Sequence, residues 1–364
     1  MTVRVGVVGY GYWGSKHARV LSSTPEVAVT IVDTSPARLA QARSAFPAAQ
    51  LAGRVSDVLP SVDALVIATP PRTHAQIAVE GALAGRHVLV EKPLATSVTD
   101  CRSVIESAND AGVVLMVGHT FEYNAAVRKL GELIDNRELG DICYIDSARL
   151  NLGLYQQDVN VLWDLAPHDI SIINFLLHRS PSGVAAWGQA HASDVLEDVA
   201  YLQLRYTNPG VTTYIHVSWL DPCKVRRVTV VGTEKMAVYD DVSPNERIRI
   251  YDVGVTAPTE ADVMHSIPMS YRYGDIISPY IPFEEPLALQ DAHFIQCISD
   301  GTRPRTDGAN GMAVVRVLEA ATKALLLGRE VELLPQDAVG LRAPASALTA
   351  APNGRKPDYA EADA

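Results

Sequence analysis

The chain has 364 residues, 48% of them hydrophobic, and a formal net charge of −11 at pH 7. This length and composition predict a globular protein of two domains, and the acidic balance argues against nucleic acid or an anionic membrane as the main partner, because both attract basic surfaces. The four cysteines are widely spaced and form no Cys-x-x-Cys motif, which argues against a disulfide framework and a structural zinc site.

The chain enters an apolar, β-branched run at residue 3, without the charged segment and apolar stretch that make up a signal peptide. No uninterrupted apolar run reaches about 18 residues, the length that a membrane-spanning helix needs. We therefore expect a cytoplasmic protein.

Strands and helices alternate over the first third of the chain. Apolar runs rich in β-branched residues, typical of strands buried on both faces, alternate with segments of helical periodicity. We predict strands at 3–8, 27–32, 63–68, 87–90 and 113–117, and helices at 13–22, 73–84 and 97–111. This order predicts an α/β fold with a doubly wound parallel sheet of the Rossmann type, in an amino-terminal domain of residues 1–121.

After about residue 120 the predicted strands follow one another with short connections. We predict strands at 142–151, 184–192, 199–206, 211–219, 225–232, 236–239 and 247–253, and helices at 123–134, 167–177, 287–298 and 308–326. The short connections predict a second, α+β domain with a mostly antiparallel sheet, residues 122–334. Residues 335–364, rich in alanine and proline, are expected to form a poorly ordered tail.

A glycine motif, Gly9-x-Gly11-x-x-Gly14, lies between the first predicted strand and helix. Gly9 permits a tight turn, Gly11 lets the backbone approach a pyrophosphate, and Gly14 allows the helix to pack closely on the strand. The start of the helix offers free N–H groups and a favourable dipole to phosphates. We therefore expect this segment, including Tyr12 and Trp13, to bind a dinucleotide.

Asp33 stands 19 residues beyond Gly14, at the end of the second predicted strand. A carboxylate there accepts hydrogen bonds from the adenosine ribose and repels a 2′-phosphate, so the sequence favours NAD, with Thr34 next to the same ribose. Arg38 leaves the alternative of NADP open, because an arginine near this position accommodates a 2′-phosphate. An exposed arginine on the following helix is the other interpretation of Arg38.

Thr69 and Pro70 end another predicted strand, at the sheet edge where ligands bind in open α/β folds. His74 opens the next helix, where contact with the cofactor and a capping or surface role are equally well supported. His119 follows the last strand of the first domain and is a candidate for the lining of the nicotinamide pocket.

The triplet Glu91-Lys92-Pro93 ends the fourth predicted strand. Hydride transfer from a carbinol carbon needs a base for the hydroxyl proton, and partial burial or a nearby positive nicotinamide ring lowers the pKa of a lysine enough to make it useful. Pro93 restricts Lys92 to extended conformations, and Glu91 is a candidate for orienting its neighbours or holding the ribose. A solvated loop lysine is the alternative.

Asp164 and His168 are four residues apart, so a helix would bring them onto one face. A carboxylate beside an imidazole fixes its tautomer and raises its basicity, with Asp169 as a second possible partner. We expect His168 near the amino end of an apolar helix, with a hydrogen-bonded core histidine as the structural alternative.

Polar and aromatic residues cluster near the predicted junction between the domains, where substrates often bind. The candidates for substrate contact there are Phe121, Tyr123, Asn124, Arg149, Asn151 and Tyr155, together with Lys92, Asp164 and His168. The chain has no His-Glu-x-x-His or Asp-x-Asp motif, so we predict no metal site.

The order of these motifs resembles the glucose-fructose oxidoreductase/inositol dehydrogenase/MocA (Gfo/Idh/MocA) family over residues 1 to about 330. The motifs are the glycine fingerprint, Ala-Thr-Pro-Pro-x-x-His at 68–74, Glu-Lys-Pro at 91–93 and Asp-x-x-x-His at 164–168. The resemblance implies a Rossmann domain followed by a domain with a large open sheet, which commonly forms a homodimer or homotetramer interface. It also implies Lys92 and His168 as the acid and base. Ala166 departs from the glycine that many members carry there, which puts the fit of Asp164 in doubt.

Residues 9–19 are most similar to family members that act on nucleotide-linked sugars. The sequence thus predicts an NAD(P)-dependent oxidoreductase that moves a hydride between nicotinamide and a ring carbon of a sugar or nucleotide sugar, with C3 as the first choice. The alternatives are an NADPH-dependent 3-ketosugar reductase of deoxysugar biosynthesis and a non-catalytic sensor that binds a dinucleotide.

Overall fold

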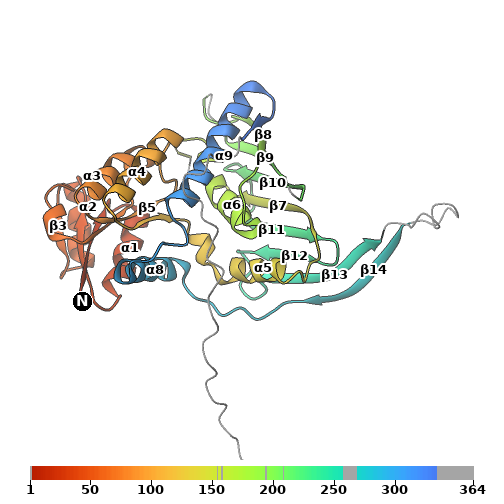
Figure 1. Cartoon of the computed structure of the whole chain (residues 1–364), viewed down its shortest axis with the longest axis horizontal. Helices are drawn as coiled ribbons and strands as arrows, with labels where there is room; N and C mark the ends of the chain where they lie inside the picture. Colours follow the sequence, from red (N-terminus) through yellow and green to blue (C-terminus); the bar gives the residue numbers. More distant parts are fainter. Residues whose placement is uncertain are drawn as a thin grey trace, which may run out of the picture.

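The fold comes from a computed structural model, which describes residues 2–153, 155–156, 159–192, 195–207, 209–256 and 269–333 (Figure 1). The predicted tail, residues 335–364, lies outside the described residues. Two sheets dominate the described part, one of six strands and one of nine.

The first sheet is parallel, with the strand order β3-β2-β1-β4-β5-β6. Its elements are β1 (Val3–Val8), α1 (Tyr12–Ser22), β2 (Val27–Val32), α2 (Pro36–Ala45), β3 (Gln50–Ala52), β4 (Ala64–Ile67), α3 (His74–Leu83), β5 (His87–Glu91), α4 (Val98–Asp110) and β6 (Leu115–Gly118), with short 3-10 turns at Leu59–Ser61, Pro71–Thr73 and Thr120–Tyr123. The chain runs outward from β1 through β2 to β3, then returns to β4 on the other side of β1. This reversal confirms the predicted doubly wound fold and creates a ligand crevice at the carboxyl ends of β1 and β4.

The second sheet has the order β14-β13-β12-β11-β7-β10-β9-β8-β15. Its strands are β7 (Ile142–Leu150), β8 (Gly183–Gln189), β9 (Val199–Tyr206), β10 (Val211–Ser218), β11 (Val225–Gly232), β12 (Met236–Asp240), β13 (Ile248–Thr256), β14 (Ser270–Ile277) and β15 (Val331–Glu332). Every pairing is antiparallel except that of β7 with β10, which confirms the predicted mostly antiparallel sheet.

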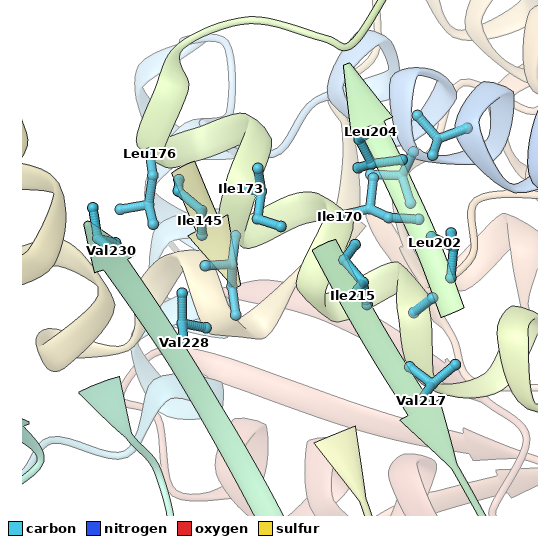
Figure 2. Packing of buried hydrophobic residues seen from close by; sticks show 14 of the residues in the cluster. Ile145, Ile170, Ile173, Leu176, Leu202, Leu204, Ile215, Val217, Val228 and Val230 are labelled. Atoms are coloured by element: carbon cyan, nitrogen blue, oxygen red, sulfur yellow. The ribbon is translucent and has the colours of Figure 1, made fainter. Parts of the chain in front are cut away.

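Helices cover one face of the second sheet, and these are α5 (Ala125–Asp135), α6 (Val161–Leu177) and most of α9 (Gly308–Leu327). Ile170, Ile173 and Leu176 of α6 point onto the strands, where Ile145 and Leu202 meet them (Figure 2). The opposite face exposes large aromatic side chains, so the sheet is open on that side; they are Trp187, Tyr201 and Tyr214.

Helix α6 begins earlier than the sequence predicts. It starts at Val161 instead of Pro167, because Asn160 accepts a hydrogen bond from the backbone N–H of Trp163 and Pro167 is accommodated inside the helix. His168 therefore lies in the second turn, which corrects its expected place near the amino end.

Two late helices return to the first sheet. Phe294 of α8 (Pro286–Asp300) is fully buried in a cluster with Val5 and Leu89, and Met312 of α9 packs in a second cluster with Val88. Figure 1 shows α8 beneath the first sheet, reached by a long connection from β14. The core beside the cofactor crevice is therefore completed by distant parts of the chain. None of the helices described is long and apolar enough to cross a membrane.

Candidate active site

A cavity of about 590 Å³ opens between the two sheets. Trp13 of α1 and Lys92 after β5 line it on one side, and His168 of α6 and Arg149 of β7 on the other. Residues 281–287, from the connection between β14 and α8 and the first turn of α8, also contribute. A second cavity, of about 410 Å³, shares Tyr12, Trp13, Glu91, Lys92 and Asp164 with it and extends to Thr69 and His74, beyond the end of β4. These volumes lie in the range of small-molecule sites.

The glycine turn has the geometry that a pyrophosphate requires. Gly9 has φ +89°, and a Cβ there would lie 2.8 Å from the carbonyl oxygen of Ala68. A Cβ on Gly14 would lie 1.7 Å from the carbonyl oxygen of Gly9, whereas one on Gly11 would meet nothing within 4 Å. Gly9 and Gly14 are thus required for packing, and the backbone at Gly11 is open to a close approach, so the turn fits a dinucleotide.

Asp33 is held in place at the end of β2. Its carboxylate accepts hydrogen bonds from the backbone N–H groups of Tyr10, at 2.7 Å, and Ser35, at 2.8 Å, and the residue is only 6% exposed. Arg38 Nη1 lies 3.6 Å from Asp33 Oδ2. Asp33 and Arg38, the two residues that the sequence links to the choice between NAD and NADP, therefore lie together. Thr34, which follows Asp33 in the chain, is exposed.

Two histidines that the sequence singles out as cofactor candidates are buried, and of these only His74 lines a cavity. The ring nitrogens of His74 lie 2.8 Å from the carbonyl oxygens of Pro93 and Thr69, so His74 links the loop after β4 to the loop after β5, while Pro70 beside it is exposed. His119 is 1% exposed, and neither of its ring nitrogens has a partner among the described residues. Burial lowers the pKa of His119 to about 4, so its ring is neutral.

Lys92 lies between the two cavities, with its side chain 12% exposed. Its Nζ donates a hydrogen bond to the carbonyl oxygen of Asp164, at 2.8 Å, and lies 3.7 Å from Asp164 Oδ1. The other carboxylate oxygen of Asp164 accepts a hydrogen bond from Trp219 Nε1, at 3.0 Å. The end of β5 and helix α6 thus fix the ammonium group together.

His168 lines the larger cavity, and its ring lies 5.0 Å from the ring of Phe121. Burial, and after it the positive charges of Lys92 and Arg149, hold the pKa of His168 well below its usual value of 6.5. The imidazole is therefore neutral at physiological pH and able to accept a proton.

The expected contact of Asp164 with His168 is not formed. Nδ1 of His168 is buried without a partner among the described residues, because Asp164 turns to Lys92 and Trp219. Asp169, the second candidate partner, accepts hydrogen bonds from Ser147 and Arg149 instead. The structure brings Lys92, Asp164 and His168 to one cavity but pairs the carboxylate with the lysine.

A buried cluster of three charged residues lies behind Lys92. His17 of α1 bonds Glu91 through Nε2, at 3.0 Å, and Asp291 of α8 through Nδ1, at 2.9 Å. His17 and Asp291 are fully buried, and Glu91 is 4% exposed. Burial alone would lower the pKa of His17, but the two carboxylates raise it to about 10, so the ring is an imidazolium. Glu91 also accepts a hydrogen bond from the backbone N–H of Lys92.

Two protein-family models match most of the described chain. The model of the oxidoreductase family with an NAD-binding Rossmann fold, GFO_IDH_MocA, matches residues 3–119, and the model of the GFO/IDH/MocA C-terminal domain matches residues 127–238. The chain belongs to the Gfo/Idh/MocA family. It is therefore an oxidoreductase with an NAD-binding Rossmann domain, as the motifs predicted.

Individual relatives of this Gfo/Idh/MocA protein are distant. It is 28% identical over 225 residues to an uncharacterized oxidoreductase of Streptococcus pneumoniae serotype 4, a match that spans 57% of this chain and 60% of that protein. It is 27% identical over 259 residues to a UDP-N-acetylglucosamine 3-dehydrogenase of Acidithiobacillus ferrooxidans, covering 69% of this chain and 78% of the relative. The crystal structure of GenD2 from gentamicin A biosynthesis, in complex with NAD, superposes with a TM-score of 0.77 at 27% identity, covering 92% of this chain and 97% of GenD2.

Besides Lys92, Asp164 and His168, three of the six other predicted substrate residues of this Gfo/Idh/MocA chain line the larger cavity. Phe121 lies beneath the guanidinium of Arg149, with Cζ 4.6 Å from the ring centre, and Arg149 is paired with Asp169. Asn124 lines the cavity too, but its side chain caps α5 by accepting hydrogen bonds from the backbone N–H groups of Ala126 and Val127.

The other three lie elsewhere in the fold. Tyr123 is 4% exposed, and its hydroxyl contacts His293 and Thr306 in the core of the first sheet. Asn151 and Tyr155 follow β7, where the Tyr155 hydroxyl donates to Asp198. Neither cavity is lined by any of the three.

Several residues at the site escaped the sequence analysis. Trp163, Gln156 and Val159 approach the smaller cavity from the second domain, and Arg226, Asp241, Arg247 and Phe283 line the larger one. The available signals were weak: His17 lies on the buried face of α1, and Arg226 is a charged residue in the otherwise largely apolar strand β11. Among the described residues, no group of three or more His, Cys, Asp or Glu is placed to hold a metal ion.

Proposed function

We propose that this protein transfers a hydride between the nicotinamide of NAD and a ring carbon of a sugar or nucleotide sugar, with C3 as the first choice. One observation carries the proposal: Lys92 and the neutral His168 line the same cavity, beside a glycine turn that is open to a dinucleotide. The UDP-N-acetylglucosamine 3-dehydrogenase among its relatives supports the choice of substrate class and carbon.

In oxidation, bound NAD would supply the hydride acceptor at C4 of the nicotinamide. We assign the hydroxyl proton to His168, because its imidazole is neutral and lines the cavity together with Lys92. Lys92, oriented by Asp164, would donate a hydrogen bond to the same oxygen and stabilise the negative charge that develops there. In reduction the same groups return the proton to the carbonyl oxygen.

The residues proposed to hold NAD surround the crevice at the switch point of the first sheet. Gly9, Gly11 and Gly14 would receive the pyrophosphate and Asp33 the adenosine ribose. The proposed contacts also include Tyr12, Trp13, Thr34, Thr69, Pro70, His74, Glu91 and His119. We also propose that the boundary between the cofactor-binding domain, residues 1–121, and the substrate-binding domain, residues 122–334, lies between residues 121 and 122.

A second candidate function is the NADPH-dependent reduction of a 3-ketosugar. The observation in its favour is Arg38, whose guanidinium lies 3.6 Å from Asp33 at the adenosine end and is 54% exposed, within reach of a 2′-phosphate. A dinucleotide sensor has less support, because it would need neither Lys92 nor His168 in the cavity.

We further propose that the protein is a homodimer or homotetramer joined through the open face of the second sheet. Trp187 is 56% exposed there and Tyr201 49%, and exposed aromatic side chains that lie together mark interaction surfaces.

Absorbance and mass spectrometry of the protein as purified, followed by turnover with NAD or NADP across inositols, free sugars and nucleotide sugars, test the function. Retained NAD and reduction of NAD by a nucleotide sugar would support it. A preference for NADP would favour the ketosugar reductase, and NAD binding without turnover on any substrate would favour the sensor. Failure to bind either dinucleotide would overturn the proposal.

A further inference from the structure

The wall that the second sheet presents to the cavity holds two arginines in directly opposite positions. Arg226 of β11 pairs in register with Arg149 of β7, and like charges at such positions destabilise a strand pair. Arg149 is neutralised by Asp169, with Nε 2.7 Å from Oδ2. In the described part of the chain, Arg226 has no carboxylate that it does not share with another arginine. This wall of the cavity therefore carries a positive charge that no partner within the sheet neutralises.

The carboxylate that faces Arg226 is that of Asp241, and its single negative charge cannot neutralise both of the arginines that it contacts. Arg226 Nη1 lies 3.6 Å and Arg247 Nη1 3.4 Å from its oxygens, and the Tyr239 hydroxyl donates to it at 2.9 Å. Two guanidinium groups therefore share one negative charge. Arg226 Nε is buried and has no hydrogen-bond partner among the described residues.

These residues belong to the cavity in which the chemistry is proposed. Arg226, Asp241 and Arg247 line it together with Lys92 and His168. At their end of the cavity the connection between β14 and α8 supplies Phe283, whose ring centre lies 5.5 Å from Arg247 Cζ. Flat guanidinium groups beside an aromatic ring form a surface suited to a planar anion, or to an anion that accepts several hydrogen bonds at once.

Guanidinium groups bind phosphates and carboxylates through paired, charge-assisted hydrogen bonds. We propose that Arg226 and Arg247 form a subsite for an anionic group of the substrate, a phosphate or a carboxylate, separate from the carbon that reacts beside Lys92. Asp241 holds the two arginines in place until that group arrives. This inference rests on the proposed function, because it names the class of sugar derivative that the same cavity accepts.

Isothermal titration of the full chain saturated with NAD tests the subsite without requiring turnover. The probes are UDP, inorganic phosphate, glucuronate and glucose. We expect the anions to bind, and Arg226→Met and Arg247→Met each to weaken their binding about tenfold or more. Arg227→Met is the matched control, since Arg227 is the next residue of β11 and lines a hollow on the open face of the sheet; it should leave binding unchanged.

Asp241→Asn should change binding in the opposite direction. The amide keeps an oxygen for the Tyr239 hydroxyl but removes the competing negative charge, so anions should bind several-fold more tightly. Arg226→Lys, which keeps the charge, should retain part of the affinity and guards against loss through misfolding. Tighter binding of UDP than of glucuronate would identify a phosphate as the natural group, and the reverse would identify a carboxylate.

Two results separate this inference from the proposed function. Anion binding that is equal in Arg226→Met, Arg247→Met and Arg227→Met, in a protein that oxidises neutral sugars with NAD, would overturn the subsite and leave the function intact. Anion binding that depends on Arg226, in a protein without turnover on any sugar derivative, would overturn the function and support the subsite.

Discussion

The two walls of the cavity hold their charges in different ways. On the side of the first sheet, His17 bonds Glu91 and Asp291 at 3.0 and 2.9 Å, and none of the three is more than 4% exposed. On the side of the second sheet, Arg226 and Arg247 share one carboxylate at 3.6 and 3.4 Å.

The difference separates two uses of charge. A closed, buried set with every partner inside the protein fixes the position of the chain that carries it, here the end of β5 with Lys92. Arg226, Arg247 and Asp241 have more positive than negative charges and line the cavity, so they remain able to bind an anionic ligand. The predictions below disturb the first wall and the cofactor crevice beside it.

The largest effect is expected at Lys92 itself. Lys92→Met removes the ammonium that we place beside the reacting oxygen, so kcat should fall about 10²- to 10³-fold while titration still shows NAD binding. Lys129→Met is the control, because this substitution changes charge and size in the same way but removes a lysine from an ion pair with Glu132 on α5. Unchanged kcat in Lys92→Met would remove Lys92 from the mechanism.

The next effect concerns the stability of the closed wall. His17→Gln leaves two buried carboxylates without their cation, which should lower the free energy of unfolding by about 3–5 kcal/mol. His178→Gln removes a comparable pair with Asp135 at 2.8 Å, but both side chains are half exposed, so the loss should be about 0–1 kcal/mol. Urea denaturation measures the free energy of unfolding of both variants. Equal losses would mean that the buried cluster stabilises the protein no more than a surface ion pair does.

The same cluster should make stability depend on pH. The pKa of His17 rises from 6.5 to about 10 on folding, so the folded state binds this proton more tightly than the unfolded state does. Its stabilising contribution is complete below the unfolded pKa and is lost as the pH rises through the folded one. The free energy of unfolding should therefore fall from neutral pH towards pH 10 in the wild type. A fall of the same size in His17→Gln would show that another group is responsible.

The smallest effect is expected at the adenosine end. Asp33→Asn keeps an acceptor for the N–H groups of Tyr10 or Ser35 but removes the charge, so NAD should bind several-fold to about tenfold more weakly while NADP loses little. Arg38→Ala should weaken NADP more than NAD. Titration of both cofactors against both variants measures this, and equal losses of NAD and NADP in Asp33→Asn would contradict the assignment of cofactor choice to this carboxylate.

Local signals were enough to predict most of the fold. The strands of the first sheet are short apolar runs, and the glycine turn and the start of α4 at Ser97 carry their own signatures, since Ser97 Oγ accepts a hydrogen bond from the N–H of Asp100. Strands β3, β14 and β15 were missed, and helix α2, on which one interpretation placed Arg38, was given no bounds. Ala42 is the one buried residue of α2, so its sequence has no apolar stripe to reveal a helix.

The clearest site predictions concern residues in a motif, whereas Phe121, Asn124 and Arg149 were predicted only from their place near the junction between the domains. Lys92 and His168 were found from their motifs, and both line the cavity. The partners of His17 were not, because Asp291 lies 274 residues away in the chain and nothing local to either residue indicates that they meet. Arg226 escaped for the same reason: its position beside Arg149 follows from the register of two strands that are far apart in the sequence.

The return of α8 to the first sheet has a consequence for how the protein is made. Phe294 fills the core beside Val5 and Leu89, and Asp291 supplies half of the charge that His17 needs. During synthesis the amino-terminal sheet emerges from the ribosome long before either residue exists. Its nucleotide crevice therefore remains unfinished until almost the whole chain has been translated, and a nascent chain shorter than about 300 residues should not retain a dinucleotide.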